Sequence, residues 1–177
     1  QIAAMKVSQV AQFTAGQIGA LSTDQVAALS NTQVAGMGGD QIASFSEDQI
    51  AALTVKAVTG LTTHHIESMS TDQIGALTTT QVAALSTAQV GAIDADLVAG
   101  FTEDQIAALS SKGIAGLSTD SIAALSTDQL GLFEAHDKPT GDVPHKQAMD
   151  RLLGRLDHRQ LRLRISLSRI LSRNNFV

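Results

Sequence analysis

"LSTDQVAALSNTQVAGM", residues 21–37, returns to the same pattern of residue types after eight residues. A hydroxyl residue, a Gln, a β-branched residue, two small residues and a large apolar residue recur in that order. With the phase set at Gln1, residues 1–136 divide into seventeen octads without an insertion or a deletion. A period this regular indicates a repeat architecture, in which neighbouring units bury each other's apolar residues.

The octad consensus is Gln-[Ile/Val]-Ala-[Ala/Gly]-[Leu/Phe/Met]-[Ser/Thr]-Thr-Asp, and positions 2 and 5 carry its large apolar side chains. Position 2 is Ile or Val in sixteen octads and Leu130 in the last, whereas position 5 is always Leu, Met, Phe or Ile. Burying two such side chains contributes ~3–6 kcal/mol, but ordering eight residues costs roughly 8–16 kcal/mol of backbone entropy. A single octad therefore cannot fold alone, and we expect positions 2 and 5 to share one continuous core.

The hydroxyl residue at position 6 is suited to begin a short helix. If Ser22 is the N-cap, Gln25 falls at the third helical position and completes a capping box, Ser/Thr-x-x-Gln. Leu21 and Val26 then stand where a hydrophobic staple joins them, and Asp24 suits the positive end of the helix dipole. The same register recurs at Ser46/Gln49, Thr78/Gln81, Thr102/Gln105 and Ser126/Gln129. The pattern predicts an all-α solenoid with one capped helix per octad, in which the small residues at positions 3 and 4 let neighbouring backbones approach closely.

Two other backbone conformations compete with the capped helix. In one continuous α-helix the apolar stripe would rotate by ~80° per octad, so that no single partner could bury it. In a flat β-strand, positions 2 and 5 would point to opposite faces, and Ala and Gly are poor strand formers. A β-solenoid with corners avoids this difficulty and remains the alternative; its flat rows of Thr would suit an ice-binding surface.

The composition excludes several classes of protein. Hydrophobic residues make up 44% of the 177 residues but aromatic residues only 3%, so Ala, Ile, Val and Leu must form the core. Because there is no Cys, disulfides, thiolate metal sites and cysteine nucleophiles are excluded. No apolar run approaches the ~18 residues of a membrane span, and the N-terminus does not have the pattern of a signal peptide. Gln1 is in phase with the repeat, so we expect a processed product or a piece of a longer array.

Octads of the type "ALSTDQIAAL" resemble the repeat tracts of very large bacterial surface or secreted proteins, described as adhesin-like or haemagglutinin-like. The resemblance covers residues 1–136 and carries no catalytic or ligand-binding motif with it. It implies a structural role at the cell surface or outside the cell.

Departures from the consensus are the places where a site could lie. His64 and His65 are adjacent with Glu67 nearby, but adjacent helical residues point apart, and Glu67 at a small-residue position indicates a local change of packing.

Asp at position 8 favours the helix N-terminus and solubility, with a calcium-binding ladder as the alternative. These residues are Asp24, Asp40, Asp48, Asp72, Asp96, Asp104, Asp120 and Asp128. Since no phosphate loop, nucleophile elbow or zinc motif occurs, we predict no enzymatic activity, no cofactor, and no catalytic, cofactor-binding or metal-binding residues.

The last 41 residues differ from the repeats in charge: residues 1–136 carry −10, with no Arg, whereas residues 137–177 carry +5, with seven Arg. Residues 137–145 contain both prolines and read as a linker. Residues 146–177 are predicted to form a basic, helical cap, since Met149, Leu152, Leu153 and Leu156 have helical spacing. The alternatives are a surface for an anionic partner, nucleic acid or membrane, a secretion or anchoring signal, or residues foreign to the repeat protein.

Taken together, these features predict a non-enzymatic structural repeat protein, a stalk, spacer, filament or adhesive segment of a bacterial surface or secreted protein. Its expected partners are itself or another protein, with no small-molecule substrate. The first alternative is a solenoid that binds a protein or peptide in its groove. The second is a calcium-binding or ice-binding β-solenoid.

Overall fold

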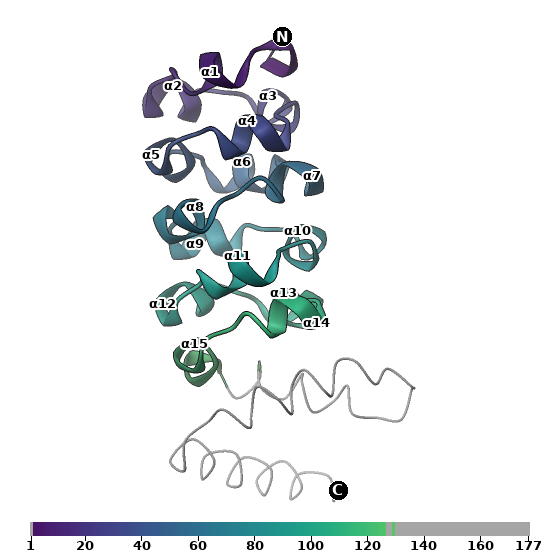
Figure 1. Cartoon of the computed structure of the whole chain (residues 1–177). Coiled ribbons are helices and arrows are strands. Elements are labelled where there is room, and N and C mark those ends of the chain that lie inside the picture. Colours follow the sequence, from purple (N-terminus) through teal and green to yellow (C-terminus); the bar gives the residue numbers. More distant parts are fainter. Residues whose placement is uncertain (1, 127–128, 130–177) are drawn as a thin grey trace, which may run out of the picture.

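The computed structural model describes residues 2–126 and residue 129, where a 3-10 helix and fifteen short α-helices follow one another (Figure 1). Their bounds are η1 Ile2–Ala4, α1 Val7–Val10, α2 Ala15–Gly19, α3 Thr23–Ala27, α4 Asn31–Ala35, α5 Gly39–Ala43, α6 Glu47–Ala52, α7 Val55–Val58, α8 Thr63–Ser68, α9 Thr71–Gly75, α10 Thr79–Ala83, α11 Thr87–Gly91, α12 Ala95–Val98, α13 Glu103–Ala108, α14 Ser111–Ile114 and α15 Thr119–Ala124. The linker predicted at 137–145 and the basic cap predicted at 146–177 lie outside the described residues.

Each helix begins where the consensus places a cap. Ser22 Oγ accepts a hydrogen bond from the Gln25 backbone N–H at 3.2 Å, and Gln25 Oε1 accepts one from the Ser22 N–H at 2.8 Å. The same reciprocal pair, with Ser or Thr as the cap and Gln at the third helical position, opens α2, α4, α6, α9, α10, α11 and α13. The prediction of an all-α solenoid of short capped helices is confirmed for the described octads.

The β-solenoid alternative, on which the ice-binding or calcium-binding face depended, is wrong for residues 2–126. Residues 2–126 contain no strand, because the backbone hydrogen bonds close within the short helices and the turns that join them. Position 6 hydroxyls that would form a flat polar grid instead accept bonds from helical N–H groups, as Ser46 does from Gln49. A row of hydroxyls free to face water is therefore not built from position 6.

The helices coil into a stack that extends along one axis (Figure 1). Each helix packs on the helix three further along the chain, as α3 does on α6, α5 on α8, and α12 on α15. Side-chain hydrogen bonds join residues 28 to 31 positions apart across the same interfaces. One turn of the solenoid therefore takes between three and four octads.

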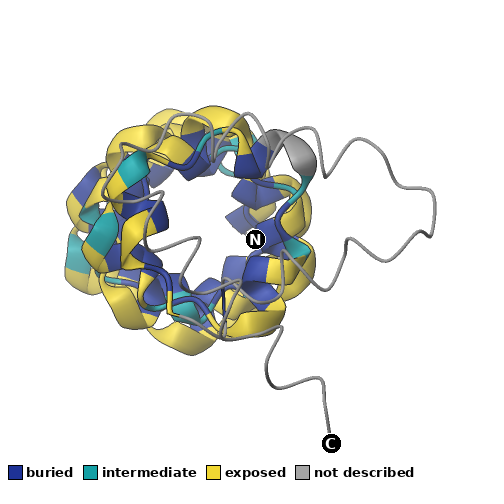
Figure 2. Ribbon diagram, turned by 90° about the horizontal axis from the view of Figure 1, so that it is seen from below, coloured by how far each residue is buried: buried dark blue, intermediate teal, exposed yellow. Residues whose placement is uncertain are grey.

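The core lies inside the coil. Viewed along the stack, the buried residues line the inside of the ring and the exposed residues form its outer wall (Figure 2). Positions 2 and 5 supply one hydrophobic cluster that extends from Ile2 to Leu125, as the period predicts. Both positions point inward because position 5 follows position 2 by three residues, close to one helical turn, and the position 5 N–H bonds to the position 2 carbonyl, as Leu29 does to Val26.

Position 3 of the octad lies on the outer wall, which corrects one interpretation of the sequence. Ala27 and Ala51 at this position are exposed, and the side chain of Glu67 is 60% exposed. Glu67 therefore does not replace a buried Ala, and the local change of packing inferred from it is wrong. In this octad the outer wall accommodates a carboxylate at position 3.

Candidate functional site

The most regular chemistry of the fold is the side-chain amide at position 1, which forms hydrogen bonds in two directions. Gln33 Oε1 accepts from the Ser30 N–H at 2.8 Å and closes the capping box of its own helix. Gln33 Nε2 donates to the carbonyl oxygens of Ile2, at 3.0 Å, and Met5, at 2.8 Å, in the preceding turn. Donation to a carbonyl 28 residues earlier recurs at Gln41, Gln49, Gln73, Gln81, Gln89, Gln105 and Gln129. We call this series of bonds the glutamine ladder.

In two octads a side chain other than Gln makes the ladder bond. His65 Nδ1 accepts from the Thr62 N–H at 3.2 Å, and His65 Nε2 lies 2.9 Å from the carbonyl oxygen of Met37. Because a carbonyl can only accept, His65 is the neutral tautomer with its proton on Nε2. In α15, Ser121 Oγ donates to the carbonyl of Ile93 at 2.8 Å. In these two octads, as in those with Gln, the position 1 side chain therefore bonds to the preceding turn.

Three octads have no such donor, because Ala57, Leu97 and Gly113 occupy position 1. Each of these octads has a glycine at position 4, which lies against the backbone of the preceding turn. A Cβ added to Gly60, Gly100 or Gly116 would lie 2.1 Å, 2.4 Å or 2.2 Å from the carbonyl oxygens of Asn31, Thr71 and Thr87, respectively. The close approach of backbones predicted for the small residues is confirmed at these glycines, where direct backbone packing takes the place of the ladder bond.

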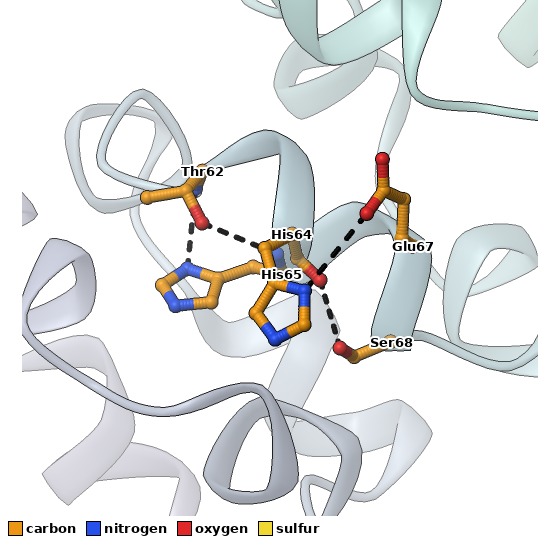
Figure 3. A network of polar contacts seen from close by, with 5 residues as sticks. All are labelled: Thr62, His64, His65, Glu67 and Ser68. Carbon is orange, nitrogen blue, oxygen red and sulfur yellow. Dashed lines mark hydrogen bonds and ion pairs between the residues drawn. The ribbon is translucent and has the colours of Figure 1, made fainter.

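The histidine cluster of α8 does not bring metal ligands together (Figure 3). His64 is exposed and its Nδ1 lies 3.9 Å from Glu67 Oε2, whereas the ring of His65 is buried and bonded to Thr62 and Met37. Ser68 Oγ donates to the backbone carbonyl of His64 at 2.7 Å. Within residues 2–126 no group of three or more His, Asp or Glu side chains is placed to hold a metal ion.

Burial lowers the pKa of His65 below its ordinary value of 6.5; the bond to Met37 opposes this shift, and the neighbouring His64 adds to it. The neutral ring can donate one hydrogen bond and accept one, as it does with Met37 and Thr62. His65 therefore acts as a structural substitute for Gln rather than as a free base.

Five of the eight Asp residues of position 8 stand on helices that pack on one another in succession. Asp24, Asp48, Asp72, Asp96 and Asp120 are each the second residue of α3, α6, α9, α12 and α15, and all are exposed. An acidic side chain in the first turn is favourable for the helix dipole. Their placement fits solvation and helix stability, the interpretation preferred from the sequence.

The first turn differs from all later turns in its position 1 side chains. Gln9, Gln17 and Gln25 are exposed, and their Nε2 atoms have no hydrogen-bond partner among the described residues. The position 5 residues Met5, Phe13 and Leu21 are only half-buried. The octads of this turn have the same consensus as the later octads, so the difference reflects their place in the first turn of the described structure.

A family model described as the ALTTAQ repeat matches the chain at residues 1–31, 26–55, 58–87 and 98–133. The chain belongs to the ALTTAQ repeat family. Three of the four ALTTAQ matches, 1–31, 26–55 and 58–87, are close in length to the 28 to 31 residues that separate ladder partners, so the family unit corresponds to about one turn of the solenoid. The matches leave out residues 56–57 and 88–97, which include Ala57 and Leu97, two of the positions without a ladder donor.

No curated protein and no solved structure matches the chain. The family match supports the tandem repeats and carries no link to adhesins or haemagglutinins. None of the described helices is long and apolar enough to cross a membrane.

Proposed function

We propose that this ALTTAQ repeat chain is a non-enzymatic structural element, a solenoid that serves as a spacer or stalk. The observation that carries the proposal is the glutamine ladder, which joins each turn to the one before it by the same bonds from Gln33 to Gln129. In such an array stability depends on contacts between neighbours, so length can grow with the number of octads.

The side chains of the outer wall and the histidines support the proposal that the chain is not an enzyme. Exposed positions carry mainly Ala, Ser, Thr and Asp, and the position 6 hydroxyls are engaged in caps. Both ring nitrogens of His65 are bonded to the backbone, while His64 pairs with Glu67. The hydrogen bonds of His65 to the backbone are those of a residue that holds two turns together, which supports a structural role for this side chain.

We also propose that the chain lies at the bacterial surface or outside the cell and that it contacts itself or another protein. This part of the proposal rests on the resemblance alone. The spacer role does not depend on the location. It depends on a rod that keeps its structure when the number of octads changes.

Length variation tests the proposal directly. Deletion of residues 33–64 removes four octads in phase, and duplication of the same residues adds four. We expect the maximum dimension from small-angle X-ray scattering to fall and rise accordingly, with the helical content per residue unchanged by circular dichroism.

Deletion of residues 33–36 alone is the matched control. It removes half an octad and puts Gln41 out of phase with its carbonyl partners, so we expect lost helicity or a lower melting temperature. An in-phase deletion that unfolds the chain, or a maximum dimension that does not follow the number of octads, would contradict the spacer role.

A further inference from the structure

The glutamine ladder lacks its Gln in two consecutive octads in the middle of the array. Ala57 has no donor, and in the next octad the ladder bond comes from His65. Gln49 and Gln73, on either side, each donate to at least two carbonyls of the preceding turn. Between these two glutamines, the bond from His65 to Met37 is therefore the only ladder bond that joins the two turns.

The octad of Ala57 joins the turns by packing alone. Its Gly60 lies close against the backbone of Asn31, and no hydrogen bond crosses between the turns there. Packing attraction falls steeply when two surfaces move apart, so this contact is lost as soon as the turns begin to separate. His65 therefore supplies the polar part of this interface by itself.

The surroundings of His65 suit the neutral ring, which is only 3% exposed. Its Nε2 donates to the Met37 carbonyl at 2.9 Å, and its Nδ1 accepts from the Thr62 N–H at 3.2 Å (Figure 3). A second proton would sit on Nδ1 and face that N–H. His65 is also the third residue of α8, close to the positive end of the helix dipole. Burial outweighs the favourable bond to Met37 and lowers the pKa of the ring below 6.5.

No carboxylate compensates for a charge on His65. Among the described residues, no Asp or Glu forms a hydrogen bond or an ion pair with the ring, and Glu67 pairs with His64 instead. Of the two helices that pack on α8, α11 carries no ionisable side chain. The charged and titratable side chains of α8 itself, of α5 and of the chain neighbours α7 and α9 are all exposed: His64, Glu67, Asp40, Lys56 and Asp72. A protonated ring is therefore better accommodated in water than in its buried place.

We propose that the interface between α5 and α8 is an acid-sensitive joint of the solenoid, closed while His65 is neutral and opened when the ring takes up a proton. In the open state the ring turns into water, the bond to Met37 is lost, and no ladder bond remains between Gln49 and Gln73. The two helices lie within the stack, with further turns on both sides (Figure 1). Because the ladder bonds on either side persist, the array bends at this point and does not unfold.

Hydrogen exchange of the full chain, from neutral pH to about pH 5, tests the joint, because carboxylates of ordinary pKa stay ionised in that range. Below pH 6.5 the equilibrium constant for opening rises by up to about tenfold per pH unit, until the pKa of the closed ring is reached. We expect the protection factors of residues 62–66, each relative to the intrinsic exchange rate at the same pH, to fall by that factor. The internal control is α13, which also has six residues and a Thr cap but has Gln105 at the third position. Its protection factors should stay constant.

Two variants assign the response to one ring. His65→Gln restores the consensus side chain, which does not titrate, and we expect it to abolish the loss of protection in α8. His64→Gln removes the exposed neighbouring imidazole and leaves both bonds of His65 in place. We expect this variant to respond to acid as the native chain does.

Spin labels on the outer wall distinguish a bend from local fraying of α8. Ala43 on α5 and Glu67 on α8 are exposed position 3 residues of packed helices, as are Ala83 on α10 and Ala107 on α13. Since the chain has no Cys, the variants Ala43→Cys/Glu67→Cys and Ala83→Cys/Ala107→Cys each take up two labels. We expect pulsed electron paramagnetic resonance to show a longer and broader distance distribution for the first pair at acid pH. The second pair should keep its distribution, and so should the first pair when His65→Gln is added.

An acid response that survives His65→Gln, or that is equal in α8 and α13, would overturn the joint. An unchanged distance between the labels at 43 and 67 would overturn it as well, because fraying of the cap does not separate the turns. None of these results would affect the spacer role, which depends on the number of octads. A failure of the length-variation experiment would in turn leave the joint standing, so the two proposals fail separately.

Discussion

The side-chain nitrogen of Gln81 lies 2.6 Å from the carbonyl oxygen of Leu53, although 28 residues separate the two along the chain. The oxygen of the same amide accepts from the Thr78 N–H at 2.6 Å and closes the cap of α10. With only 1% of Gln81 exposed, both bonds are shielded from water. One side chain therefore couples the start of its own helix to the preceding turn.

Replacing Gln81 by Glu separates the two roles. The carboxylate keeps the capping bond but turns the donor into an anion that faces the carbonyls of Ile50 and Leu53. We expect the free energy of unfolding to fall by about 3 kcal/mol at neutral pH, measured by urea denaturation. The loss should shrink at acidic pH, where a protonated Glu can donate again. Gln25→Glu is the control, and because Gln25 is exposed we expect a change within about 0.5 kcal/mol.

Adding a methyl group at Gly60 should destabilise the fold. The new Cβ would lie 2.1 Å from the carbonyl oxygen of Asn31, a backbone atom that cannot rotate away. We expect Gly60→Ala to cost about 2 kcal/mol or more in thermal or urea unfolding. Gly16→Ala is the matched control in α2: apart from its chain neighbours and its own helix backbone, no atom lies within 4 Å of an added Cβ, so the helix propensity of Ala should raise stability by up to about 1 kcal/mol. Equal effects of the two substitutions would contradict the backbone contact.

His65 should make the stability of the solenoid sensitive to acid. Its pKa in the folded state is lowered by burial below the 6.5 of the unfolded chain, so the unfolded state binds the proton more readily. The stabilising contribution is complete above pH 6.5 and is lost as the pH falls from 6.5 through the folded pKa. Protonation would also place an N–H at Nδ1 against the N–H of Thr62.

The variant His65→Gln restores the consensus and checks this effect. Melting temperatures of both chains, followed from neutral pH downward, should diverge below pH 6.5, with the variant retaining more stability. The elements packed on α8 contribute Asp40 on α5 and no ionisable side chain on α11, and both chains keep Asp40 and His64. Parallel curves for the two proteins would exclude His65 as the source of the acid sensitivity.

Calcium should have no effect on the fold. The position 8 carboxylates stand one to a helix, and the described residues bring no three acidic side chains together, whereas Ca²⁺ takes six to eight oxygen ligands. We expect neither saturating Ca²⁺ nor a chelator to shift the melting temperature. A rise with Ca²⁺ that a chelator reverses would restore the calcium-binding ladder as an explanation for the Asp residues.

The octad sequence was sufficient to predict the local structure. Ser22 and Gln25 identified the cap, and the pairing of positions 2 and 5 identified the core, because both depend on residues within one octad. Such short-range relationships are set by helix geometry alone.

Relationships between turns could not be predicted in the same way. The period of eight does not say how many octads close one turn, since that depends on the bend at each connection between helices. Without that number, Gln33 could not be paired with Met5, and the exposed Gln9 could not be distinguished from the buried Gln41. The outward direction of Glu67 could not be predicted for a related reason. The orientation of the helices around the solenoid axis decides whether position 3 or position 4 faces the outer wall.

The glycines at position 4 bear on how the array could change over evolutionary time. Ala57 and Gly60, the missing donor and the residue that compensates for it, lie in the same octad, as do Leu97 and Gly100, and Gly113 and Gly116. A gain or loss of eight codons in phase would carry both members of a pair together, and it would give the glutamines of the following turn new carbonyls of the same kind. Each octad is thus a self-contained unit of insertion or deletion. The protein can gain or lose one octad without a second, compensating mutation elsewhere.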